Sequence, residues 1–183
     1  YDGDKVIWYK NDGSENFTQI DVVTGKNEVT EVFAKDMDND GDIDVLFTSD
    51  NGGSGIVGWC ENDGSENFTY HAITTGITGR SVFAIDVDGD GDVDALSAQG
   101  NNIEWHENNG SESFTKHTIT TDAKSAYSVY AIDLDRDGDM DVLSASYDDD
   151  KVAWYENNGS QSFTAHIIIG GSTQYQINPK SIY

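Results

Sequence analysis

Fifteen aspartates in three short stretches are the residues most able to do chemistry. The stretches cover residues 36–44, 86–94 and 133–141, and each places Asp at every second position and Gly at the sixth. Five carboxylates this close together repel one another and are costly to desolvate unless a cation lies among them. Ca²⁺ takes only oxygen ligands and tolerates flexible geometry. The pattern therefore predicts a Ca²⁺ site in each stretch, or about three Ca²⁺ ions per chain.

Within each stretch the positions have different expected roles. Carboxylates at the first, third, fifth and ninth positions would bind the ion, and the seventh residue would bind through its backbone carbonyl. Gly at the sixth position lets the chain turn sharply around the ion. Solvated acidic turns are the alternative, but three copies in the same Gly phase favour metal binding. The predicted metal-binding residues are Asp36, Asp38, Asp40, Asp42, Asp44, Asp86, Asp88, Asp90, Asp92, Asp94, Asp133, Asp135, Asp137, Asp139 and Asp141.

The stretches differ from EF-hand loops, although their first six positions match that motif. An EF-hand has a bidentate Glu at the twelfth position and a helix on each side. The twelfth residues here are Phe47, Ser97 and Ser144. The flanking segments 82–86 and 94–98 are short apolar runs of strand length. Each acidic stretch is therefore expected to connect the two strands of a β-hairpin.

The composition limits the classes of partner. The net charge is −24, which makes nucleic acids and anionic membranes unfavourable partners. No apolar run is long enough to cross a bilayer, so no membrane insertion is expected. The single cysteine, Cys60, excludes an intrachain disulfide and is assigned no chemistry. Oxygen-only Ca²⁺ sites suit the millimolar Ca²⁺ outside cells, so we expect a secreted, extracellular or cell-surface protein.

The chain is built from a repeat of about 48 residues. Trp8, Trp59, Trp105 and Trp154 each begin a similar string that contains a Gly and ends in Phe-Thr. In one complete unit, apolar runs predict strands at 81–85, 93–98, 103–107 and 114–120. The stretch Asn108-Asn-Gly-Ser111 predicts a hairpin turn between the last two strands. Four antiparallel strands per unit are typical of a β-propeller blade, so the predicted fold class is all-β.

The repeat phase sets the expected boundaries. The chain would hold about 3.7 repeats, whereas propellers close with four to eight blades. We therefore expect one β-propeller segment of a larger ring, with the remaining blades supplied by the same chain or by a second chain. The predicted divisions are a partial blade at 1–25, blades at 26–75, 76–122 and 123–169, and the start of another at 170–183.

These strings and acidic loops together resemble the FG-GAP/VCBS-type repeats of the integrin α-subunit β-propeller and its bacterial relatives. The resemblance covers essentially all 183 residues. It implies that Ca²⁺ lies in the hairpin between the first and second strands of each blade, held by the aspartates given above. The Phe-Gly and Gly-Ala-Pro signature of the family is absent, and Val-Phe-Ala or Val-Tyr-Ala precedes each loop. Integrin-like partner recognition is therefore not expected.

The other candidate residues are better explained by the repeat than by catalysis. His71, His117 and His166 each lie three residues after the Phe of their unit, which favours a packing or surface position. The tryptophans recur once per unit, and we interpret them as packing between blades rather than as sugar-stacking residues. The sequence contains no nucleophile with a general base, no phosphate-binding loop and no Cys/His cluster. The sequence therefore predicts a protein that is not an enzyme.

Ligand binding is expected on the variable connections between strands. These connections are 49–55, 99–102, 147–150, 74–80, 121–127 and 170–176, and in a propeller they share the face opposite the Ca²⁺ hairpins. The candidate ligand-binding residues are Arg80, Tyr127, Tyr147 and Tyr175. The predicted function is a non-catalytic Ca²⁺-binding module for adhesion or for glycan or protein binding. The alternatives are a propeller of an extracellular polysaccharide lyase or hydrolase, and a structural spacer in a large repeat protein.

Overall fold

The structure is a computed structural model and describes residues 4–170 and 179–182. These residues form strands, turns and coil only, which confirms the all-β prediction. None of them forms a helix that could cross a membrane. The strands are β1 (Lys5–Asn11), β2 (Phe17–Thr24), β3 (Val29–Lys35), β4 (Asp44–Asn62), β5 (Phe68–Ile85), β6 (Asp94–Gln99), β7 (Asn102–Asn108), β8 (Phe114–Thr120), β9 (Ala126–Ile132), β10 (Asp141–Ser146), β11 (Lys151–Asn157) and β12 (Phe163–Ile169).

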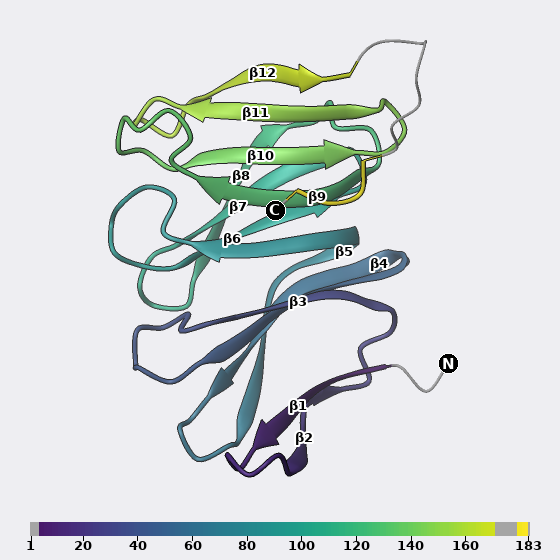
Figure 1. The fold of residues 1–183 in the computed structure, drawn as a ribbon, viewed down its shortest axis with the longest axis vertical. Helices are drawn as coiled ribbons and strands as arrows, with labels where there is room; N and C mark the ends of the chain where they lie inside the picture. Colours follow the sequence, from purple (N-terminus) through teal and green to yellow (C-terminus); the bar gives the residue numbers. More distant parts are fainter. Residues whose placement is uncertain (1–3, 171–178, 183) are drawn as a thin grey trace.

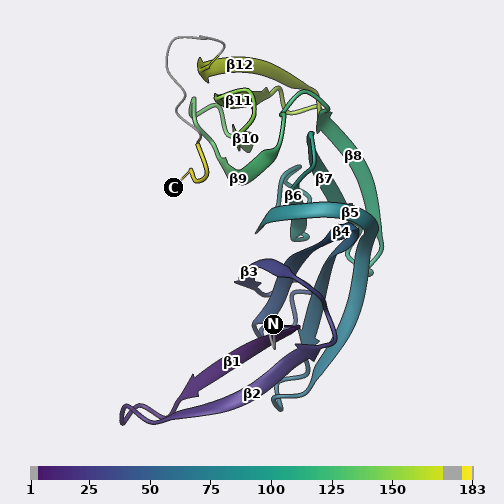
Figure 2. The ribbon, with the colours of Figure 1, turned by 90° about the vertical axis from the view of Figure 1, so that its right-hand side faces the viewer.

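The strands form three antiparallel sheets of two, six and four strands (Figure 1). The last sheet, in the order β12-β11-β10-β9, has the four strands that the sequence predicts for one unit. The middle sheet runs from β3 to β8 without interruption and so joins two predicted units. Figure 2 shows the sheets following one another along a curved path from β1 and β2 to β12. None of the sheets formed by the described residues closes on itself.

The six-stranded sheet differs from the separate four-stranded sheets that the sequence predicts. It arises because β4 and β5 are long: Asp44–Ser49 of β4 pairs with β3, and Asp50 and Gly55–Asn62 pair with β5. In the same way, β5 pairs first with β4 and then, through Gly79–Ile85, with β6. The predicted connections 49–55 and 74–80 therefore lie within strands. The β-branched residues of Thr74-Thr-Gly-Ile-Thr favour an extended backbone, which explains how β5 continues through this segment.

The hydrophobic core lies between consecutive repeats. Trp59 is buried in one cluster with Val82 and Ala84, which belong to the next repeat. Trp105 is buried in the following cluster with Val129 and Ala131. Each repeat therefore covers the first strand of its successor, as expected for tryptophans that pack between units. Full burial of an apolar side chain of this size stabilises the fold by roughly 2 kcal/mol or more.

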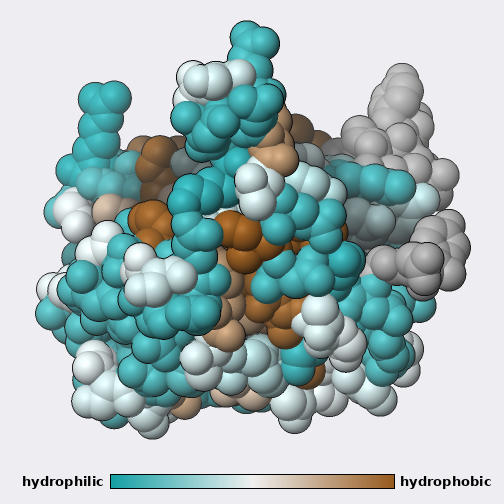
Figure 3. Space-filling model, turned by 90° about the horizontal axis from the view of Figure 1, so that it is seen from below, coloured by the Kyte–Doolittle hydropathy of each residue, from teal (hydrophilic) through white to brown (hydrophobic). Residues whose placement is uncertain are grey.

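The equivalent face of β3 is open to solvent. Val32 is 50% exposed, whereas the corresponding Val82 and Val129 are only 2% and 4% exposed. An apolar groove of about 310 Å³ lies between this face and the β1–β2 hairpin, and its lining includes Trp8 and Ile43. Figure 3 shows hydrophobic surface at this end of the molecule. The β3 face therefore lacks the covering strand that the later repeats provide for one another.

Candidate metal centres and aromatic loop surface

The three acidic loops connect neighbouring antiparallel strands. They join β3 to β4, β5 to β6 and β9 to β10, so each occupies the tip of a hairpin. Gly41, Gly91 and Gly138 at the sixth positions have φ angles of 96°, 98° and 102°. Residues other than glycine rarely adopt this backbone conformation. The predicted sharp turn is therefore present in every loop.

Carboxylate oxygens converge within each loop. In the first two loops, oxygens of the first, third and fifth aspartates lie within 4.8 Å of one another, and in the third loop those of the first, third and ninth do so. The Asp36 Oδ2 atom accepts a hydrogen bond from the Gly41 N–H at 3.1 Å. The Asp36 Oδ1 atom is buried and has no hydrogen-bond partner. A buried acceptor beside two further carboxylates fits a hard divalent cation.

The electrostatics of the loops also favour a cation. Desolvation raises the pKa of Asp38 and Asp88, and the neighbouring carboxylates raise it further. The same causes raise the pKa of Asp135 in the third loop. Ionising these groups at neutral pH is therefore costly in the absence of a counter-ion. A bound divalent ion would offset the repulsion between the carboxylates and compensate for their lost hydration.

The ninth aspartate of each loop holds the hairpin together. Asp94 is fully buried and accepts hydrogen bonds from the backbone N–H groups of Val87 at 2.9 Å and Asn108 at 2.8 Å. Asp44 and Asp141 make the equivalent pairs of bonds in their own repeats. Burial raises the pKa of Asp44 and of Asp94 to about 6, in spite of these hydrogen bonds. These residues therefore fix the loop geometry from inside the sheet.

The side chain of the seventh aspartate in each loop lies against a glycine of a neighbouring turn. A Cβ atom added at Gly64 would collide with the carboxylate of Asp42, and the same holds for Gly110 against Asp92. Asp139 lies against Gly159 in the corresponding way. These carboxylates therefore pack against the turn that follows the third strand of the repeat.

Three of the four candidate ligand-binding residues come together on the loop surface. The Arg80 guanidinium lies 5.7 Å from the centroid of the Tyr127 ring, and the Tyr127 and Tyr147 ring centroids are 6.2 Å apart. Tyr127 is near the start of β9 and Tyr147 follows β10, so both are at the end of these strands opposite to the acidic loop. The fourth candidate, Tyr175, lies outside the described residues.

The sequence did not reveal one member of this group. The Lys180 ammonium lies 5.4 Å from the Tyr127 ring centroid and 5.2 Å from that of Tyr147. Arg80 also forms an ion pair with Asp50 at 2.9 Å, which holds its side chain across the surface. No sequence spacing relates Lys180 to the two tyrosines. We call Arg80, Tyr127, Tyr147 and Lys180 the aromatic loop surface.

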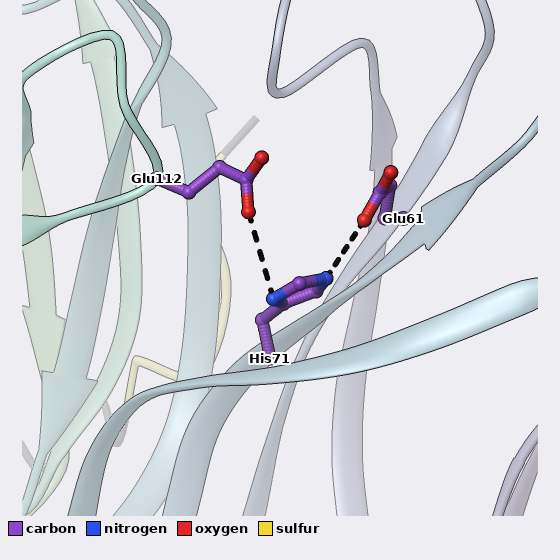
Figure 4. Close-up of side chains that lie close together, drawn as sticks. All are labelled: Glu61, His71 and Glu112. Carbon is purple, nitrogen blue, oxygen red and sulfur yellow. Dashed lines mark hydrogen bonds and ion pairs between the residues drawn. The ribbon is translucent and has the colours of Figure 1, made fainter.

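A second cluster missed by the sequence analysis contains a histidine and two glutamates (Figure 4). The His71 Nε2 atom lies 2.9 Å from Glu61 Oε2, and the His71 Nδ1 atom lies 3.7 Å from Glu112 Oε2. The His71 ring stacks on Trp59, with ring centroids 4.7 Å apart. The sequence does contain a signal for the histidine–glutamate pair, because a Glu follows each of the last three tryptophans by two residues. In the structure, each of these glutamates pairs with the histidine of its own repeat.

The sequence profile of the FG-GAP-like repeat family matches residues 36–97, 86–144 and 133–179. The chain belongs to the FG-GAP-like repeat family. No curated protein matches the chain. Among solved structures, this FG-GAP-like chain is similar to an Agrocybe aegerita lectin described as recognising non-reducing terminal N-acetylglucosamine, with a TM-score of 0.63 and 18% sequence identity. The match covers 92% of this chain and 48% of the lectin chain, so this chain spans about half the length of that protein.

Proposed function

We propose that this FG-GAP-like chain is a Ca²⁺-stabilised, non-catalytic β-propeller segment that binds glycans through the aromatic loop surface, in a secreted or cell-surface protein. The observation that carries the proposal is the convergence of Arg80 from one repeat with Tyr127 and Tyr147 from the next. The likeness to a lectin supports the same reading.

The chemistry of the aromatic loop surface suits a saccharide. Tyrosine presents an apolar ring face and a hydroxyl group, so it can contact the C–H face of a sugar and also bond to its hydroxyls. Arg80 and Lys180 add donors that could bond sugar oxygens or an acidic substituent. In a chain with a net charge of −24, Lys180 beside the two tyrosines, together with Arg80 in its ion pair with Asp50, forms a locally favourable place for a polar ligand.

Calcium would act on folding rather than on a reaction. The ion would be held by the carboxylates of the acidic loops and by the backbone carbonyl at the seventh position. The chain's own contribution is the preformed hairpin, fixed by residues such as Asp94 that bond the backbone from within the sheet. Filling the sites would couple the metal affinity to the stability of the folded state.

The open face of β3 supports a place within a larger ring. In the later repeats the corresponding face is covered by the tryptophan-bearing repeat before it. We therefore propose that further blades, from the same chain or a second one, cover Val32 and Ile43 and complete a propeller of four-stranded blades.

A glycan array probed with the Ca²⁺-loaded protein tests the proposal. We expect selective binding that Tyr127→Ala and Tyr147→Ala each reduce at least tenfold. Tyr9→Ala is the matched control, because Tyr9 is 56% exposed on β1 and should not affect binding. An array without binding, or equal loss in all three variants, would contradict glycan binding at this surface. Cleavage of an acidic polysaccharide would contradict the non-catalytic part of the proposal.

A further inference from the structure

The cluster of Glu61, His71 and Glu112 joins two repeats. Glu61 lies on β4 and His71 on β5, and these strands pair with each other within one repeat. Glu112 comes from the turn between β7 and β8, in the next repeat. One nitrogen of His71 and one oxygen of each glutamate lie within 4.8 Å of one another. The three donors are therefore close enough for a side-chain movement to bring them onto one ion.

The other junctions between repeats show why this one is unusual. At the first junction, Lys10 occupies the position of Glu61 and forms an ion pair with Glu66, the counterpart of Glu112. At the third junction, the counterpart is the neutral Gln161, which donates to Asp88 at 3.1 Å. The second junction has two carboxylates, and among the described residues no lysine or arginine pairs with either of them. His71 is therefore the group that these two carboxylates share at this junction.

The donor set indicates what kind of cation would fit. An imidazole nitrogen together with two carboxylates suits Zn²⁺ and similar divalent transition ions, whereas Ca²⁺ prefers oxygen ligands alone. Three protein ligands would leave a fourth position for water. We infer that Glu61, His71 and Glu112 form a divalent transition-metal site, distinct from the acidic loops, that links two consecutive repeats.

The surroundings hold two of the three ligands in place. Stacking against the buried Trp59 fixes the plane of the His71 ring, and strand pairing fixes the backbone of Glu61. As Figure 4 shows, the two carboxylates face different nitrogens of the ring. Binding of one ion therefore requires Glu112, whose side chain is half-exposed on a turn, to swing towards the nitrogen that faces Glu61. The site is consequently one that closes on the ion and draws the two repeats together.

Calorimetric titration with Zn²⁺ tests this site, with Ca²⁺ in excess to keep the acidic loops filled. We expect one Zn²⁺ per chain, with the affinity lowered at least tenfold by His71→Gln and by Glu112→Gln. His117→Gln is the matched control. His117 stacks on Trp105 and pairs with Glu107 in the equivalent way, but Gln161 replaces the second carboxylate there. His117→Gln should leave the affinity unchanged. Melting curves in Ca²⁺ without Zn²⁺ show whether each variant is folded.

Fluorescence gives a second readout that a purely structural role would not change. A bound Cu²⁺ ion would lie beside the ring that stacks on Trp59, so we expect Cu²⁺ to quench tryptophan emission in the unmodified protein and in His117→Gln. Quenching at the same concentration should be lost in Glu112→Gln. Absence of Zn²⁺ binding would overturn the inference. Equal weakening by His71→Gln and His117→Gln would also overturn it, because any histidine–glutamate pair would then suffice. Neither result depends on whether the aromatic loop surface binds glycans.

Discussion

Asp94 accepts a hydrogen bond from the backbone N–H of Asn108 at 2.8 Å and so joins the start of β6 to the end of β7. Its other oxygen accepts from Val87 in the acidic loop. One buried carboxylate thus connects the candidate metal centre to both strands behind it. The same arrangement in Asp44 and Asp141 means that the loops and the sheets cannot rearrange independently.

This burial predicts an unusual pH dependence for the metal-free protein. The pKa of Asp44 and of Asp94 is raised to about 6, so the folded state binds protons that the unfolded state releases near pH 4. Their contribution to stability is therefore present below about pH 4 and is lost as the pH rises through 6. In chelator, we expect the free energy of unfolding to fall over this interval by roughly 3 kcal/mol for each aspartate, with a corresponding fall in the melting temperature.

Excess Ca²⁺ should remove this loss, because the ion favours ionised carboxylates around it. Melting curves from pH 4 to 7, with chelator and with Ca²⁺, check the prediction. A stability that rises with pH in chelator would contradict the assigned burial effect.

Removal of one loop carboxylate should affect stability only when Ca²⁺ is present. Asp88→Ala is expected to remove one of about three Ca²⁺ ions in a calorimetric titration and to lower the melting temperature in Ca²⁺. In chelator the change should be small. Asp122→Ala is the control, since its side chain is 81% exposed and lies outside the loops. Equal destabilisation of Asp88→Ala in both conditions would argue against calcium.

The sixth position of the loop should tolerate only glycine. Gly91→Ala places a Cβ in open space but forces it onto a backbone with φ of 98°, so the cost is conformational. We expect a loss of about 1–2 kcal/mol in unfolding free energy. Gly89→Asn is the control, because the equivalent Asn39 adopts a φ of 64°. Chemical denaturation measures both, and an unaffected Gly91→Ala would contradict the strain.

The valines at equivalent strand positions offer a matched pair. Val82→Thr buries a hydroxyl in the core between repeats and should cost about 1–3 kcal/mol in unfolding free energy. Val32→Thr makes the same chemical change on an open face and should cost much less. Urea denaturation of both variants compares them directly. Equal losses would show that the β3 face is covered in solution.

Sequence reasoning captured the parts of the fold that each repeat specifies alone. The hairpin position of the acidic loops, the strand at 114–120 and the glycine turns follow from local pattern and backbone chemistry. The continuation of β5 through 74–80 did not, because glycine and threonine there were interpreted as a connection although β-branched residues also favour strands. Metal binding and ligand binding stay predictions.

The pairing of side chains from different repeats was the least accessible to sequence. Arg80 and Tyr127 are 47 positions apart, and neither belongs to a repeated string, so only the curvature of the chain brings them together. The approach of Glu112 to His71 has the same origin. Contacts within a repeat could be inferred by comparison of the copies, whereas contacts between repeats depend on how consecutive sheets pack.

The uncovered face of β3 has a consequence for the order in which the molecule opens. In a linear array each unit is stabilised by its neighbours, and an uncapped end is held from one side only. The backbone amides of β1, β2 and β3 should therefore exchange with solvent deuterium well before those of β6 and β7, whose residues are almost all buried. Native-state fraying would thus start at the β3 end and travel towards the middle repeats, so that this end sets the kinetic lifetime of the isolated chain.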